Sequence, residues 1–222
     1  AEGVKSFSIS KRNLLNRYKV VNPEIVEQLY KEGKSVLLVS GHYGNWEFMV
    51  QSLNLHFSHQ GAGVGKPITN DGFGKIMNKS RSRFGMEIWD HTNVRDEIKN
   101  HIDSNSLFCC MLLADQSTSN TDKSYWMRFL NQDTPALFGP EKLAKTHNLP
   151  VVYYDVNKVK PGYYEIVLKA VSLNPTKEAH GDITYKYNKM LEQHIVAKPE
   201  YWLWSHKRWK HSAQSHKYEV RQ

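Results

Sequence analysis

The chain reads VLLVSGHYGNWE from Val36 to Glu47. The apolar run 36–39 is typical of a buried strand, and it leads His42 into a turn that contains two glycines. Residues five apart on one regular helix point about 140° away from each other, at roughly 100° per residue. His42 and Glu47 can therefore meet only if a turn separates the strand from a helix that begins near Asn45.

Local residue preferences favour that turn. Gly41 and Gly44 accept backbone conformations that other residues avoid, and Asn45 is a good N-cap. Glu47 then falls in the first helical turn, where the helix dipole favours its ionised form. We predict that His42 is a base oriented by Glu47, a pair that can activate a hydroxyl. The alternative is a hydrogen-bonded turn histidine beside an ordinary first-turn charge.

Strand and helix patterns alternate along the rest of the chain. Apolar periodicity predicts helices over residues 23–31, 45–56, 71–83, 93–101, 137–147 and 182–197, and strands over 35–39, 62–65, 86–88, 106–113, 151–156 and 163–170. The polar stretch 114–133 has no periodicity and is expected to be a long loop. This alternation predicts one α/β domain over residues 1–222, with a central, largely parallel mixed sheet flanked by helices.

Composition sets broad limits on the class of protein. The 222 residues are enough for one large core, and 40% hydrophobic with 12% aromatic residues exclude a disordered chain. A net charge of +8 suits nucleic acid, an anionic membrane or an acidic protein partner. Cys109 and Cys110 are adjacent in an apolar strand and face opposite ways, so we expect core residues rather than a disulfide. The sequence has no 18-residue apolar run, which predicts that no transmembrane helix lies within it.

Further polar residues follow the predicted strands. Lys66 ends the strand 62–65, and Asp115 and Gln116 follow the strand 106–113. Ligands gather at the carboxyl ends of parallel strands, so these residues and the His42 turn are expected to converge if their strands are neighbours.

Basic and aromatic residues form two other groups. Lys79, Arg81 and Arg83 could hold phosphates or carboxylates, or form a solvated basic face. The segment 202–210 interleaves tryptophan with lysine and arginine, which is typical of nucleic-acid stacking, of a membrane interface, or of indoles packed on the sheet with cations outside. The eleven histidines show no recognisable ligand spacing, so no metal site is expected.

Five ordered blocks resemble the bacterial lipid A biosynthesis acyltransferases, the late lauroyl and myristoyl transferases of the lysophospholipid acyltransferase superfamily. The segment 37–47 resembles their first motif, in which four residues separate a histidine from an acid. Gly65-Lys66-Pro67 with Arg83-Phe84-Gly85 is similar to the second block, and Ala114-Asp115-Gln116 to the third. Residues 138–152 and 199–210 resemble the remaining blocks, so the likeness covers roughly residues 20–210.

The resemblance implies a glycerol-3-phosphate acyltransferase-like fold and an O-acyltransferase with an HX4E motif. His42 would be the general base that Glu47 orients, and Gly44, Asn45, Lys66, Arg83, Asp115 and Gln116 would bind substrate. The implied reaction moves an acyl chain from a thioester, carried by acyl carrier protein or coenzyme A, to a hydroxyl of a lipid A precursor of lipopolysaccharide. The thioester is a co-substrate, and no cofactor or metal is expected.

The implied partners are an anionic lipid acceptor and a membrane surface, with no nucleic acid. The implied location is the cytoplasmic face of the bacterial inner membrane. Because relatives usually carry an N-terminal anchoring helix, the chain is expected to be a catalytic domain without that anchor. Two alternatives stay open, namely transfer to another membrane glycolipid or aminolipid, and a non-catalytic basic lipid-binding module. A hydrolase is disfavoured because no G-x-S-x-G nucleophile elbow is present.

Overall fold

The strand that ends in the His42 turn lies at the centre of the sheet. The computed structural model describes residues 5–222, and its main sheet has seven strands in the order β1-β9-β8-β2-β5-β3-β4. Five neighbouring strands run parallel: β8 (Val151–Lys160), β2 (Val36–Ser40), β5 (Phe108–Leu113), β3 (Gln60–Gly65) and β4 (Glu87–Asp90). At the edge, β9 (Tyr163–Ser172) is antiparallel to β8, and β1 (Tyr18–Val20) is parallel to β9. The predicted α/β domain with a mostly parallel mixed sheet is confirmed.

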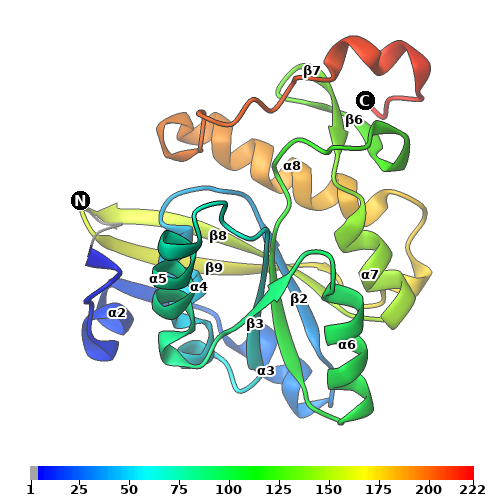
Figure 1. Ribbon diagram of the computed structural model, residues 1–222. Helices are drawn as coiled ribbons and strands as arrows, with labels where there is room; N and C mark the ends of the chain where they lie inside the picture. Colours follow the sequence, from blue (N-terminus) through cyan, green and yellow to red (C-terminus); the bar gives the residue numbers. More distant parts are fainter. Residues whose placement is uncertain (1–4) are drawn as a thin grey trace.

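Helices cover both faces of the parallel strands, which explains their continuous apolar runs. All five residues of β2 are buried. Helices α4 and α5 lie to one side of these strands, and α6 and α7 lie to the other (Figure 1). The helices are α2 (Lys11–Arg17), α3 (Glu24–Lys31), α4 (Trp46–His56), α5 (Asp71–Arg81), α6 (Val94–Asp103), α7 (Gly139–His147) and α8 (Asp182–Ala197). None of these helices is both long and apolar enough to span a bilayer.

Local capping sets where the helices begin. Asn45 caps α4, since its side chain accepts a hydrogen bond from the N–H of Phe48 at 3.2 Å. Asn70 caps α5 in the same way, through the N–H of Phe73 at 2.9 Å. Both caps satisfy backbone donors that the first helical turn leaves free. The predicted start of the helix near Asn45 is confirmed.

The polar stretch predicted as a long loop contains a strand. Residues 125–129 form β6 (Tyr125–Phe129), which pairs antiparallel with β7 (Gln132–Ala136). Leu130 and Asn131 make the turn with φ values of 49° and 60°. A two-residue hairpin turn of this kind usually has the sequence Asn-Gly. This turn has Leu-Asn instead, so the sequence gives no sign of a hairpin. The other predicted strands and helices are confirmed, whereas α2 and β1 were not predicted.

The segment after α8 packs on this hairpin. Trp126 stacks on Tyr218 at 4.8 Å between ring centroids, and the N–H of Arg221 donates to the carbonyl of Trp126 at 3.1 Å. Figure 1 shows the hairpin and this C-terminal segment together at one end of the molecule. The C-terminal segment includes the 3-10 turns η4 (Pro199–Tyr201) and η5 (Ser212–Lys217).

One expectation for the aromatic and basic segment is wrong. Its cations do not all lie outside, because Arg208 is only 2% exposed. The Arg208 guanidinium donates to the carbonyl of Pro135 at 3.0 Å and lies 5.9 Å from the centroid of the Phe129 ring. Burial lowers its pKa to about 10. The two free cysteines, Cys109 and Cys110, are buried as predicted.

His56, the last residue of α4, is expected to make the fold sensitive to acid. Burial lowers the pKa of His56 from 6.5 to about 4. In the unfolded chain His56 therefore binds a proton below pH 6.5, whereas in the folded chain it stays neutral down to about pH 4. The free energy of unfolding therefore falls as the pH falls through this window. Between pH 7.5 and 5, this group should lower the free energy of unfolding by roughly 2 kcal/mol.

Urea denaturation of the wild type and of His56→Gln at both pH values measures this effect. The variant should lose that part of the pH dependence, since glutamine does not titrate. Equal pH dependence in the two proteins would show that His56 is not held neutral in the folded state.

Candidate active site

Three strand ends meet at one edge of the sheet, as their sequence positions predicted. The His42 turn follows β2, Asp115 and Gln116 follow β5, and Lys66 follows β3, and these strands are adjacent and parallel. A pocket of about 640 Å³ opens there, and its lining includes His42, Glu47, Lys66 and Gln116. Its size falls within the range of small-molecule and cofactor sites.

The two glycines of the turn allow neighbouring side chains to pack closely against the backbone on both sides. Gly44 has φ +59°, and a Cβ there would stand 2.8 Å from Cγ1 of Val156. A Cβ on Gly41 would stand 2.7 Å from a methyl carbon of Leu191 and 3.1 Å from the carboxyl carbon of Asp115. Larger residues would therefore push the turn away from both α8 and Asp115.

Tyr43, between these glycines, ties the turn to α8. Its hydroxyl donates to the carbonyl of Lys198 at 2.8 Å, and its ring stacks on His194 at 5.2 Å. Nδ1 of His194 in turn lies 2.8 Å from a carboxylate oxygen of the buried Asp155. Burial, together with neighbouring acidic groups, raises the pKa of Tyr43 to about 12, so the hydroxyl stays protonated and keeps its hydrogen bond.

Asp115 holds the imidazole of His42. One carboxylate oxygen lies 2.6 Å from Nδ1 of His42, and the other accepts the backbone N–H of His42 at 2.9 Å. The second oxygen also accepts the indole N–H of Trp202 at 2.8 Å. Asp115 is only 4% exposed. Burial raises its pKa, but the hydrogen bonds from His42 and Trp202 more than offset this, so the pKa of Asp115 lies below its ordinary value.

This contact selects the tautomer of His42. An ionised carboxylate can only accept, so Nδ1 carries the proton and Nε2 keeps its lone pair. Nε2 lies 3.4 Å from the amide nitrogen of Gln116, and both residues line the pocket. The ring also packs edge-on against Trp46 at 5.2 Å. The arrangement presents a base, oriented from behind by a carboxylate, to the pocket.

The expected contact between His42 and Glu47 needs correction. Glu47 makes a two-point ion pair with Arg81, in which Nε lies 3.0 Å from Oε2 and Nη2 contacts Oε1. Glu47 is in the first turn of α4 and Arg81 in the last turn of α5, and these helices pack side by side. The two-donor guanidinium matches the carboxylate geometry, so Glu47 points to α5 while Asp115 takes Nδ1.

The other residues expected to bind substrate do not all line the pocket. Lys66 is exposed and lines the pocket, whereas Asn45 serves as the cap of α4. Arg83 lies outside the lining, donates to the carbonyl of Phe7 at 3.3 Å and packs on the ring of Phe84. Its expected place beside the pocket is taken by Arg81, two residues earlier on α5.

Backbone N–H groups of the glycine turn are one possible set of donors to an oxyanion. Three of them are already used inside the protein. The N–H of His42 donates to Asp115, that of Tyr43 to the carbonyl of Gly41, and that of Gly44 to the carbonyl of Tyr201. Those three N–H groups are therefore not free to bind an oxyanion, whereas the side chains of Gln116 and Lys66 line the pocket.

Apolar side chains make up much of the lining of the pocket that holds the base. These apolar side chains come from the strands β3, β4 and β5, the segment after β3, the helices α4, α6 and α7, and the segment that leads into α7. They include Val50, Val64, Ile68, Ile88, Val94, Met111, Leu112, Leu113, Leu137, Pro140 and Leu143. A base that shares a pocket with these apolar side chains fits a substrate with a reactive polar end and a hydrocarbon chain.

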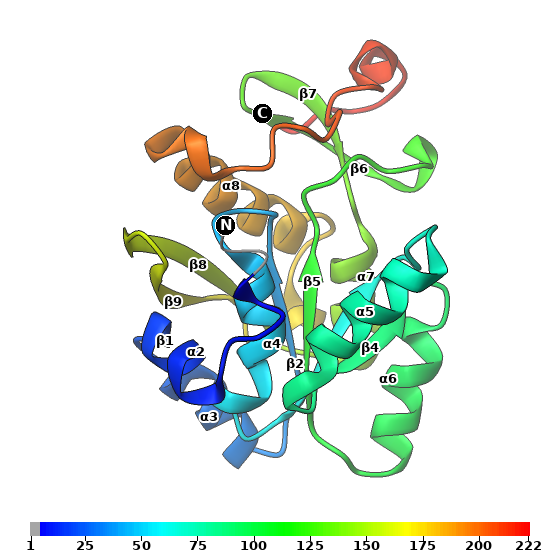
Figure 2. The same cartoon turned by 60° about the vertical axis from the view of Figure 1, so that its left-hand side comes forward.

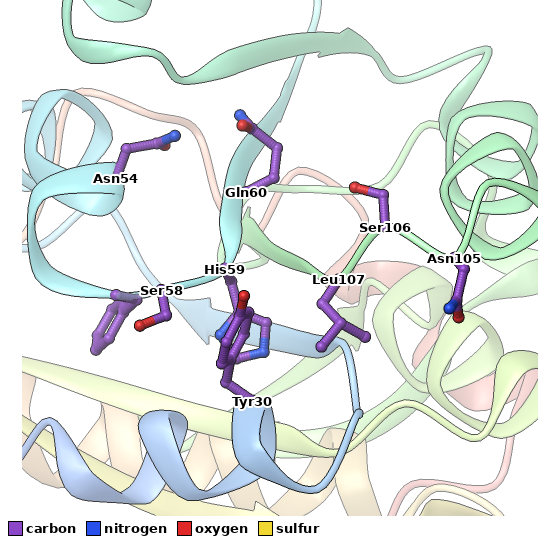
Figure 3. Close-up of a pocket in the computed structure, with 9 residues that line it drawn as sticks. Tyr30, Asn54, Ser58, His59, Gln60, Asn105, Ser106 and Leu107 are labelled. Carbon is purple, nitrogen blue, oxygen red and sulfur yellow. The ribbon is translucent and has the colours of Figure 1, made fainter.

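A second pocket, of about 510 Å³, lies where β3 and β5 begin, at the opposite edge of the sheet. Figure 3 shows its residues, with the rings of Tyr30 and His59 close together. His59 is buried, its Nε2 lies 2.9 Å from the carbonyl of Lys34, and burial lowers its pKa. The lining carries no carboxylate, so it offers no oriented base like His42.

Within residues 5–222, no group of three or more histidine, cysteine, aspartate or glutamate side chains could hold a metal ion.

Sequence reasoning missed the partners of two site residues. Trp202 was seen only as part of an aromatic and basic segment, yet its indole N–H binds Asp115. Arg81 was seen only as one member of a basic cluster, yet it holds Glu47. Neither contact has a local signal, because the partners are separated by 87 and 34 residues.

A comparison with protein families found one match. The model described as bacterial lipid A biosynthesis acyltransferase matches residues 2–211 of the 222. No curated protein matches the chain.

Proposed function

The chain belongs to the bacterial lipid A biosynthesis acyltransferase family, and we propose that it moves a fatty acyl chain from a thioester to a hydroxyl of a lipid A precursor. One observation carries the proposed chemistry. Asp115 lies 2.6 Å from Nδ1 of His42, while the other ring nitrogen belongs to a residue that lines an apolar pocket. A base in this position can activate a hydroxyl directly.

The proposed reaction needs no acyl-enzyme. Nε2 of His42 takes the proton of the acceptor hydroxyl as its oxygen bonds to the thioester carbonyl carbon. The tetrahedral adduct then breaks its carbon–sulfur bond, and the leaving thiolate receives the proton from the imidazolium. Asp115, held ionised by its hydrogen bonds, stabilises the imidazolium between these steps.

The adduct carries an oxyanion, and polar side chains that line the pocket are the proposed donors. The amide nitrogen of Gln116 lies 3.4 Å from Nε2 of His42, beside the point of attack. The ammonium of Lys66 lines the same pocket. The Glu47–Arg81 pair forms part of the wall beside them and is proposed to position these groups rather than to transfer a proton.

The acyl chain is proposed to occupy the apolar part of the pocket. Acyl carrier protein is the proposed thioester carrier, with coenzyme A as the alternative. The carrier is acidic, so the net charge of +8 would speed encounter with it. We place the reaction at the cytoplasmic face of the bacterial inner membrane, where an anionic lipid acceptor is available. Nucleic acid has no part in this proposal, and the thioester needs no further cofactor or metal.

Lipid mass spectrometry of a strain that lacks the gene tests the function. Its lipid A should be lighter by one acyl group, and re-expression of the wild type should restore that mass. If the missing acyl group instead belongs to another glycolipid or aminolipid, the acceptor assignment is wrong while acyl transfer stands. An unchanged lipid profile, with no transfer of labelled acyl chains by the purified protein, would contradict the function and favour a lipid-binding role.

A further inference from the structure

Helix α5 exposes two large apolar side chains on one flank. Phe73 is 51% exposed and Ile76 is 56% exposed. They lie three residues apart, so they are neighbours on the helix surface. Single exposed apolar residues are common on proteins, but an adjacent pair on one helix leaves a contiguous apolar patch in water.

Two lysines lie beside this patch. Lys75 and Lys79 are exposed and four residues apart, so they share the flank that adjoins Ile76. Asp71, in the first turn, is the one acidic residue of α5. An apolar flank next to a basic flank is the pattern of helices that lie in the surface of an anionic bilayer, where lysine stems extend along apolar surface and keep the charge in water.

The C-terminal end of α5 reaches the catalytic pocket. Arg81, its last residue, lines the pocket and binds Glu47. Gly74 packs against Ile68, another lining residue, since a Cβ there would stand 3.5 Å from Cβ of Ile68. Figure 2 shows α5 on the outside of the domain, in front of the strands β4 and β5. One face of the helix therefore meets solvent, while its other face packs on α4 and its last residue lines the pocket.

We propose that the face of α5 formed by Phe73, Lys75, Ile76 and Lys79 docks the protein on an anionic lipid bilayer, with the pocket beside the membrane surface. This placement deepens the proposed function, because a lipid acceptor could then reach His42 without crossing bulk water. The apolar pair would insert among the headgroups while the two lysines meet lipid phosphates. An acidic carrier protein is the competing occupant, and the test separates the two.

Vesicle co-sedimentation tests this surface. The probe is a set of phosphatidylcholine vesicles with and without phosphatidylglycerol. The wild type should bind the anionic vesicles more tightly than the neutral ones. The double change Lys75→Glu and Lys79→Glu should weaken binding to anionic vesicles by at least about ten-fold, because each cation near such a surface contributes a factor of about five. Phe73→Ser with Ile76→Ser should weaken binding to a similar extent.

A matched control comes from the opposite edge of the sheet. Ile102, near the end of α6, is 48% exposed, and Ile102→Ser should bind vesicles like the wild type. His42→Ala should also bind like the wild type, so a failure of the catalytic proposal would not alter this result. Circular dichroism checks that each variant is folded.

Two outcomes would overturn the docking surface. In one, the α5 variants bind anionic vesicles as tightly as the wild type. In the other, these variants lose binding to purified acyl carrier protein while vesicle binding is unchanged, which would assign the face to the carrier.

Discussion

Asp115→Asn is expected to lower kcat for acyl transfer by about 10³- to 10⁴-fold. The wild-type carboxylate accepts from Nδ1 of His42 at 2.6 Å and so keeps the lone pair on Nε2. An asparagine can present its amide N–H to Nδ1, which favours the tautomer whose proton sits on Nε2. That tautomer cannot take a proton from the acceptor, and a neutral amide cannot stabilise the imidazolium.

Glu47→Gln is the matched control for Asp115→Asn. It removes one carboxylate charge at the same pocket but leaves the contact between Asp115 and His42 in place. We expect a loss of about ten-fold or less, because the Arg81 pair is weakened while the base keeps its tautomer. Steady-state rates with an acyl thioester and a lipid acceptor compare the two variants. A larger loss in Glu47→Gln than in Asp115→Asn would mean that Glu47 orients the base during turnover.

Replacing His42 by alanine is expected to lower the rate of acyl transfer by about 10⁴-fold. The change removes the base and leaves the apolar lining of the pocket intact. Binding of the acyl donor should therefore change little, and the loss should appear in the chemical step. Single-turnover transfer of a labelled acyl chain measures that step directly.

His216→Ala provides the control for this loss. His216 is exposed on η5, outside the pocket lining, and its removal should leave the transfer rate within about two-fold of the wild type. If His42→Ala retained transfer near the wild-type rate, another group would have to act as the base.

Much of the fold could be read from the chain because its signals are local. The apolar strands, the cap at Asn45 and the alternation of strands with helices all depend on residues close in sequence. The hairpin of β6 and β7 was missed because it has no such local signal. Its turn places Leu130 and Asn131 at positive φ without a glycine, and the burial of Trp126 and Phe129 comes from contacts with the C-terminal segment and α8.

In the candidate site too, some features follow from neighbouring residues and others from contacts between distant ones. The sequence by itself determined that a strand delivers His42 into a glycine turn before a capped helix, since each step follows from side chains within a few residues. Only the tertiary structure decided which carboxylate meets the imidazole. Asp115 is 73 residues away from His42, and the parallel pairing of β2 with β5 places it at Nδ1. Glu47, close in sequence, is drawn away because α5 packs beside α4 and offers the guanidinium of Arg81.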